Sequence, residues 1–150
     1  MSLTIGNKYE ILNVIGEGTF GRVFKGKNIR SSEEIAIKIQ HKAIANVLKH
    51  EAKIYRCLKD ISGVPRIRNY GSEEGFNYLI LDLLGPSLDQ QTLNTSETIK
   101  YMIDILNIIE KIHNIGIIHR DIKPENFLLN RIGENRVYLI DFGLSKYYLT

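Results

Sequence analysis

What constrains the fold of this chain most is the order of its strand-forming and helix-forming segments. Five segments have the composition or the alternation of β-strands: residues 9–15, 22–27, 33–40, 66–70 and 77–82. Residues 45–59 interrupt them with apolar residues at helical spacing. Gly85-Pro86 then breaks the pattern, either as a joint between lobes or as a turn. A strand-rich first part followed by a helix-led second part predicts an α+β fold with two lobes.

The second part begins with a long predicted helix over residues 94–113. Asn94 stands three residues before Glu97, which is the spacing of a helix start with Asn94 as the cap. Gly116 ends the helix. Six apolar residues recur along one side of it and are expected to be buried: Ile99, Met102, Ile103, Leu106, Ile109 and Ile112. Residues 117–150 are expected to form short strands and loops.

The composition is that of one folded domain and excludes several classes of protein. Of the 150 residues, 43% are apolar and 25% are charged, which suffices for a core. The formal net charge is +3 without any run of five like charges, so nucleic-acid binding is not indicated. Neither a signal peptide nor a run of about 18 apolar residues is visible, so we expect a cytoplasmic or nuclear protein without a membrane partner. The single cysteine, Cys57, lies among apolar helix positions and is expected to be a buried thiol.

Three glycines separate the first two predicted strands. Residues 16–23 fit the pattern G-x-G-x-x-G-x-V, in which glycines let the backbone approach phosphates and present N–H donors to them. A plain hairpin turn is the simpler interpretation. A dinucleotide-binding fingerprint would need a helix directly after the loop, whereas residues 22–25 are typical of a strand.

A charged pair is predicted within apolar surroundings. Lys38 lies in the alternating strand 33–40, beside the small Ala36 and opposite three isoleucines. Glu51 lies in the middle of the apolar stripe of the helix 45–59, where a charge requires a partner. Pairing of the two would hold the ammonium group toward phosphates. The alternatives are a solvent-facing lysine on an edge strand and a glutamate that reaches water from the edge of the stripe.

The most specific block is His119-Arg120-Asp121-Ile122-Lys123-Pro124-Glu125-Asn126. Asp121 can accept the proton of an attacking hydroxyl group, and Lys123 can neutralise charge on a transferring phosphoryl group. Asn126 can bind a divalent ion through its amide oxygen.

A second acidic block follows twenty residues after Asp121. Asp141-Phe142-Gly143 comes directly after the predicted strand 137–140. A carboxylate at the end of a strand, followed by glycine, suits a hard cation such as Mg²⁺.

Taken in order, these blocks resemble the signature set of the protein kinase superfamily over essentially the whole chain. Lys123 in D-I-K-P-E-N is similar to the Ser/Thr class. A closer resemblance, to the casein kinase I family, rests on three stretches: Leu83-Leu84-Gly85-Pro86-Ser87-Leu88, Lys123-Pro124-Glu125-Asn126-Phe127-Leu128 and Ile140-Asp141-Phe142-Gly143-Leu144-Ser145-Lys146-Tyr147. Asp82 and Ile122 depart from it, because Glu is usual at the first position and Val or Leu at the second.

The resemblance implies ATP and Mg²⁺ as cofactors and protein Ser/Thr hydroxyls as acceptors. The residues it assigns to the ATP site are Ile15, Gly16, Glu17, Gly18, Thr19, Phe20, Gly21, Val23, Ala36, Lys38, Glu51, Leu81, Asp82, Leu84 and Leu128. Among them, Leu81 is the gatekeeper. It assigns catalysis to Asp121, Lys123 and Lys38, and metal binding to Asn126 and Asp141. His119 and Phe142 would be packing residues of the regulatory spine.

The resemblance also implies a division of residues 1–150. Residues 1–84 would be the complete small lobe and hinge, an antiparallel sheet plus one helix, and residues 85–150 the beginning of a larger lobe. The activation segment and further helices are absent from the sequence, so much of the apolar stripe of the helix 94–113 is expected to face water. The alternatives are a catalytically inactive nucleotide-binding or scaffolding module and a small-molecule phosphotransferase of kinase-like fold. The oligomeric state stays open.

Overall fold

The chain has a mixed α+β fold, as predicted. It is described from a computed structural model, which covers residues 2–18, 21–44, 46–133 and 135–149. Contacts divide the chain into two compact units, of which the first comprises residues 1–53 and 66–83 and the second residues 54–65 and 84–150. The two units are taken separately below. In the described part of the chain, no helix is long and apolar enough to cross a membrane.

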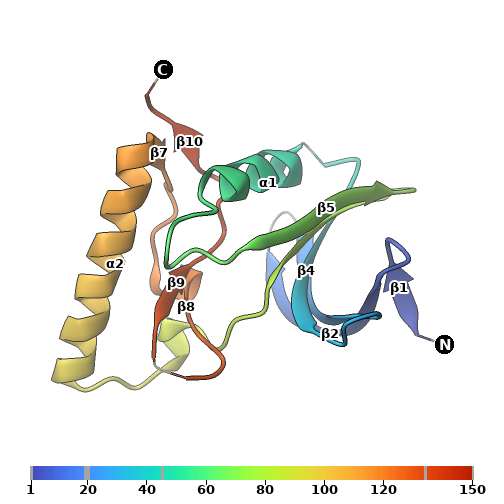
Figure 1. Ribbon diagram of the computed structural model, residues 1–150. Coiled ribbons are helices and arrows are strands. Elements are labelled where there is room, and N and C mark those ends of the chain that lie inside the picture. The colour runs from blue at the N-terminus through green and yellow to red at the C-terminus, as the bar shows by residue number, and fades with distance from the viewer. Residues whose placement is uncertain (1, 19–20, 45, 134, 150) are drawn as a thin grey trace. The chain divides into compact units, whose positions relative to one another are not determined.

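The first unit is built on a curled antiparallel sheet of six strands (Figure 1). The strands are β1 (Leu3–Ile5), β2 (Tyr9–Gly18), β3 (Gly21–Asn28), β4 (Glu34–His41), β5 (Ile67–Glu73) and β6 (Phe76–Asp82), and their order in the sheet is β1-β2-β3-β4-β6-β5. Five of these strands were predicted from alternation and composition. The short β1 was not, because three residues are too few to show a period.

One face of this sheet carries the core of the first unit. Ile35 and Ile37 of β4 are buried, and Ile39 packs against the same cluster, as the alternation of the strand predicts. The remaining buried members come from three other strands: Ile5, Tyr9, Tyr78 and Ile80. The opposite face of β4 carries Ala36, Lys38 and the buried Gln40.

Helix α1 (Val47–Cys57) is shorter than the predicted 45–59 and contributes residues to both units. Its start is held by Gln40 of β4, whose Oε1 accepts a hydrogen bond from the Leu48 backbone N–H at 3.1 Å. Such a side-chain acceptor satisfies one of the N–H groups that a helix start leaves without a partner.

The prediction of a buried thiol at Cys57 is wrong, because this side chain is exposed. The buried stripe of α1 passes through Ile54 and Tyr55 and continues to Leu58, and Cys57 falls outside it. Its Sγ atom lies 3.3 Å from the hydroxyl of Tyr147.

The second unit contains the long helix α2 (Thr95–Ile115) with both predicted ends. Asn94 caps the start: its Oδ1 accepts from the Glu97 backbone N–H at 2.8 Å, and the Glu97 carboxylate accepts from the Asn94 N–H at 3.4 Å. Gly116 ends the helix in the left-handed conformation, with φ of 97°.

Short elements follow α2, as predicted for residues 117–150. They are β7 (Ile117–Ile118), η2 (Pro124–Asn126), β8 (Phe127–Leu129), β9 (Val137–Leu139) and β10 (Lys146–Tyr147), and η1 (Leu88–Gln90) precedes α2. β8 pairs with β9 and β7 pairs with β10, both antiparallel.

The buried side of α2 differs from the predicted stripe. Ile112 is buried, but the other buried residues are Tyr101 and Ile108. Four members of the predicted stripe are 51–61% exposed: Ile99, Met102, Ile103 and Leu106. The helix therefore has two apolar sides, and the described residues of this unit cover only one. The expectation that much of the predicted stripe faces water is met.

Candidate active site

The glycine-rich stretch connects two strands, not a strand and a helix. β2 and β3 pair through Gly16↔Val23 and Gly18↔Gly21, with an irregularity of register at Ile15. This geometry excludes the strand–loop–helix arrangement of a dinucleotide-binding fingerprint. Thr19 and Phe20, which the resemblance assigns to the ATP site, lie outside the described residues. Glu17 forms an exposed ion pair with Arg22 at 3.3 Å.

The sheet face opposite the core carries four of the predicted site residues. Directly paired residues of neighbouring antiparallel strands point to the same side. Val23 pairs with Lys38, and Ala36 pairs with Leu81. Val23, Ala36, Lys38 and Leu81 therefore share one face, and it combines apolar side chains with a cation.

Lys38 and Glu51 form the predicted ion pair. The distance from Lys38 Nζ to Glu51 Oε1 is 2.8 Å, and the side chain of Glu51 is only 1% exposed. A buried carboxylate without a cation would be costly, so the pair fixes the ammonium group at this point of the sheet face. Neither of the two simpler interpretations, an edge lysine or a glutamate that reaches water, fits this geometry.

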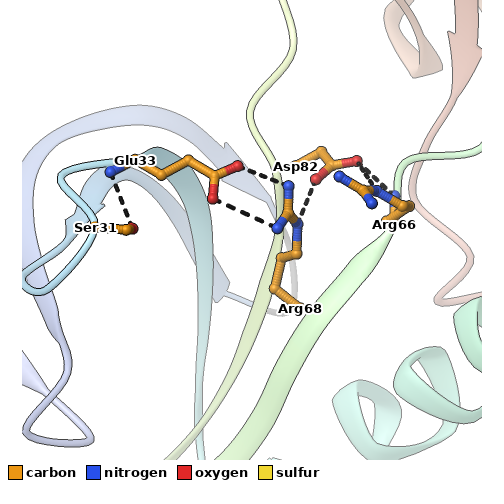
Figure 2. Close-up of polar contacts among 5 residues, drawn as sticks. All are labelled: Ser31, Glu33, Arg66, Arg68 and Asp82. Atoms are coloured by element: carbon orange, nitrogen blue, oxygen red, sulfur yellow. Dashed lines mark hydrogen bonds and ion pairs between the residues drawn. The ribbon is translucent and has the colours of Figure 1, made fainter.

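The end of β6 is held by a network that the sequence did not indicate (Figure 2). The Asp82 carboxylate accepts hydrogen bonds from Arg68 Nε at 2.6 Å and from the Arg66 backbone N–H at 3.0 Å. Arg68 also pairs with Glu33 at 2.7 Å. The hydrogen bond with Asp82 is the main reason why the pKa of Arg68 is raised. These contacts connect β5 and β6 with the residue before β4.

In the second unit, the loop after β7 brings Asp121 and Asn126 together. The Asn126 amide nitrogen donates to the Asp121 backbone carbonyl at 2.9 Å and to its carboxylate at 3.2 Å. Both bonds use the nitrogen, so the amide oxygen is the atom of Asn126 that a cation would take. Lys123 Nζ lies 3.6 Å from Asp121 Oδ1.

His119 supports this loop in a defined protonation state. Its Nδ1 accepts from the Asp121 N–H at 3.1 Å, which leaves the hydrogen on Nε2 to be donated to the Ile140 carbonyl at 2.9 Å. Burial lowers the pKa of His119, although the bond to the Ile140 carbonyl opposes that effect. The ring is therefore neutral at pH 7 and links the Asp121 loop to the segment before Asp141.

Asp141 follows shortly after β9 in an unusual backbone conformation, and Phe142 comes next. Asp141 has φ of 63°, in the left-handed region that few residues other than glycine adopt. Phe142 is fully buried between two rings, with centroid distances of 5.1 Å to Tyr55 and 4.8 Å to His119. The Asp141 backbone N–H donates to the Tyr55 hydroxyl at 3.2 Å.

Tyr55 is the site residue that sequence reasoning missed. It was counted only as one apolar position of the helix over 45–59. The available signal was its position one helical turn after Glu51, on the same side of α1.

Leu84 and Leu128, also assigned to the ATP site by the resemblance, are both half-buried residues of the second unit. The segment between Leu84 and Ser87 runs beside β8: the Gly85 N–H donates to the Leu129 carbonyl at 2.6 Å, and the Leu129 N–H to the Pro86 carbonyl at 2.9 Å. Gly85-Pro86 thus lies at the start of the second unit.

The candidate residues form two groups. The first unit holds Ile15, Gly16, Glu17, Gly18, Gly21, Val23, Ala36, Lys38, Glu51, Leu81 and Asp82, and the second holds Leu84, Asp121, Lys123, Asn126, Leu128 and Asp141. Among the described residues, no group of three or more His, Cys, Asp or Glu side chains could hold a metal ion.

The oxygen atoms of Asn126 and Asp141 fit a different kind of metal site. Mg²⁺ is commonly bound through one or two protein oxygens together with phosphates of a substrate. The residues present therefore suit a magnesium–nucleotide complex better than a metal held by protein side chains alone.

A paired lysine and glutamate, a glycine-rich hairpin and an Asp–Asn loop followed by Asp-Phe-Gly are the parts of a nucleotide-dependent phosphotransferase. A family model, Protein kinase domain, matches residues 9–150 of this chain. The chain therefore belongs to the protein kinase family.

Proposed function

We propose that this chain acts as a Ser/Thr protein kinase of casein kinase I type, which transfers the γ-phosphoryl group of ATP to Ser or Thr hydroxyls of proteins. The observation that carries the proposal is the Asp121 loop. Its carboxylate is held by Asn126 on one side and has the Lys123 ammonium group 3.6 Å away on the other. A lysine in this place is typical of the Ser/Thr class, and the Leu83–Leu88 stretch favours casein kinase I.

In this proposal Asp121 orients the acceptor hydroxyl and takes its proton. Lys123 and Lys38 neutralise negative charge, and Glu51 keeps the Lys38 ammonium group in place. Asn126 and Asp141 would hold Mg²⁺, which supplies charge neutralisation at the phosphates when bound.

The adenine ring would lie against the sheet face of the first unit. Val23, Ala36 and Leu128 would supply apolar contacts to the ring, with Leu81 as the gatekeeper. The backbone groups of Asp82 and Leu84 would meet its polar edge. The glycine-rich hairpin, residues 15–21, would cover the phosphates with backbone N–H groups.

The test is phosphate transfer from labelled ATP to a peptide mixture containing Ser, Thr and Tyr, followed by identification of the modified amino acid. We expect phosphoserine and phosphothreonine. Asp121→Asn should lower kcat by orders of magnitude, because the proton acceptor is lost. Phosphotyrosine as the main product would contradict the Ser/Thr class, and near-normal turnover by the Asp121→Asn variant would remove Asp121 from its role.

A second candidate is a nucleotide-binding or scaffolding module without catalysis. The exposed apolar residues of α2, Ile99, Met102, Ile103 and Leu106, favour it, because such a surface suits a partner. The retained Asp121, Asn126 and Asp141 count against it. Stabilisation by Mg-ATP without any phosphate transfer would favour this second candidate over the first.

A further inference from the structure

The hydroxyl of Tyr55 contacts the backbone of the residue proposed to hold Mg²⁺. The Asp141 N–H donates to the Tyr55 hydroxyl at 3.2 Å, across 86 positions of the chain. The side chain of Tyr55 is 1% exposed. A tyrosine buried to this extent brings its hydroxyl into the interior, where it requires hydrogen-bond partners.

The contact falls where the backbone conformation is least favourable. Asp141 adopts φ of 63°, and the left-handed region is disfavoured for residues that carry a Cβ atom. A residue in such a conformation keeps it only when its surroundings hold it there. Since φ sets the direction of the Asp141 Cα–Cβ bond, a group that holds the Asp141 amide also sets the direction from which the carboxylate extends.

The packing of the Tyr55 ring does not explain why this residue carries a hydroxyl group. The Tyr55 ring meets the Phe142 ring edge to face at 5.1 Å, and a phenylalanine ring in place of Tyr55 would make the same contact. The hydrogen bond from the Asp141 N–H, in contrast, needs the oxygen.

We propose that the Tyr55 hydroxyl is a positioning group for Asp141: it holds the Asp141 amide, and through it the carboxylate, in the orientation used for Mg²⁺. Tyr55 is thus a positioning residue and not a catalytic one. This inference rests on the proposed function, because it assigns the aimed carboxylate to the metal.

The direct test is hydrogen exchange of single backbone amides in the protein without nucleotide or metal. Tyr55→Phe keeps the ring and removes only the oxygen, so the fold is expected to persist. We expect the Asp141 amide to exchange roughly tenfold faster in this variant. The Leu139 amide, which donates to the Gly63 carbonyl at 2.8 Å, should exchange at the wild-type rate. An unchanged rate at Asp141 would overturn the proposal.

A matched control uses the same chemical change elsewhere in the second unit. Tyr101 on α2 is also buried, and it belongs to neither group of candidate residues. Tyr101→Phe should leave both the Asp141 amide and the dependence of turnover on Mg²⁺ unchanged. If Tyr101→Phe accelerated exchange at Asp141 as much as Tyr55→Phe, the effect would be a general loosening and the proposal would fail.

The kinetic test compares the Mg²⁺ concentration that gives half-maximal kcat. We expect Tyr55→Phe to raise this concentration roughly three- to tenfold, as fits the loss of one hydrogen bond. The KM for the peptide should stay unchanged. Faster exchange at Asp141 with an unaltered Mg²⁺ dependence would make the bond purely structural and overturn the proposal.

Asp141→Asn separates failure of this inference from failure of the proposed function. If Asp141→Asn abolishes turnover while Tyr55→Phe changes neither readout, Asp141 keeps its role and only the role of Tyr55 is lost. If Asp141→Asn turns over normally, the proposed role of Asp141 is wrong, and the inference about Tyr55 is wrong with it.

Discussion

At the scale of single residues, the Lys38–Glu51 pair differs from other ion pairs of the first unit in its burial. Glu51 is almost fully buried, whereas both side chains of the neighbouring pair Lys25–Glu34 are about one third exposed. Both pairs are short, at 2.8 Å and 2.6 Å. Desolvation, not distance, therefore decides what the loss of each lysine costs.

We predict that Lys38→Met lowers the free energy of unfolding by about 3 kcal/mol, because Glu51 loses its cation while it stays buried. The matched control Lys25→Met should cost less than about 1 kcal/mol. Urea unfolding of both variants measures the difference. Equal losses would show that burial of Glu51 does not matter. Lys38→Met should also lower kcat more than it weakens adenosine binding, and an unchanged kcat would refute the proposed role of Lys38.

The neutral His119 makes stability depend on pH. Its pKa is lowered in the folded protein, so the unfolded chain binds a proton first as the pH falls. The stabilisation is complete above the unfolded pKa of about 6.5 and is lost as the pH falls below it. We expect the unfolding free energy to drop between pH 7.5 and 5.5, measured in buffer without metal, and to drop more in the wild type than in His119→Gln. Identical pH profiles would show that His119 titrates alike in both states.

At the scale of elements, the end of β6 is held against β5 by side chains and backbone together. The Asp82 N–H donates to the Arg66 carbonyl at 3.1 Å, and the Asp82 carboxylate receives Arg66 and Arg68 (Figure 2). Since all three side chains are partly exposed, the charges contribute modestly to stability and are screened by salt. The main effect of the network is to fix the position of Asp82, at which the chain leaves the sheet after β6.

We predict that Asp82→Asn raises the inhibition constant of adenosine about three- to tenfold and leaves that of tripolyphosphate unchanged, because the network lies at the proposed adenine edge and not at the phosphates. Lys38→Met should show the reverse preference. Competition against ATP in the phosphate-transfer assay gives both constants. Equal weakening of the two inhibitors would indicate a general loss of structure in the Asp82→Asn variant.

At the scale of the whole molecule, the candidate residues are divided between the two units. A ligand that binds the folded chain and not the unfolded one stabilises the fold by an amount that grows with the logarithm of its concentration relative to Kd. The response of the complete chain to nucleotide therefore tests the assignment as a whole.

We predict that the chain unfolds in a cooperative thermal transition and that Mg-ATP raises its midpoint temperature. At a concentration one hundred times the dissociation constant, Mg-ATP should raise the free energy of unfolding by about 2.7 kcal/mol. The Lys38→Met variant should respond less at the same concentration. Scanning calorimetry with and without Mg-ATP makes the measurement. A broad transition without any response to nucleotide would contradict assembly of the site in residues 1–150.

Features that arise from neighbouring residues could be predicted from the sequence. Asn94, Glu97 and Gly116 specify the ends of α2 because their hydrogen bonds span only three or four positions. The alternation in β4 specified which side of the strand is buried, since successive side chains point to opposite faces. The kinase motifs were likewise readable, because each is a short run of residues.

Features that depend on residues far apart in the chain could not be predicted and required the folded structure. The pattern of α1 left Glu51 ambiguous, and only the folding of β4 beside it paired Glu51 with Lys38. The exposure of Cys57 and the choice of the buried side of α2 follow from which segments pack against each helix, and helical spacing does not contain that information. The Tyr55–Asp141 contact joins positions 86 apart. Side chains so distant meet only when the core brings their backbones together, so no local pattern predicts such a contact.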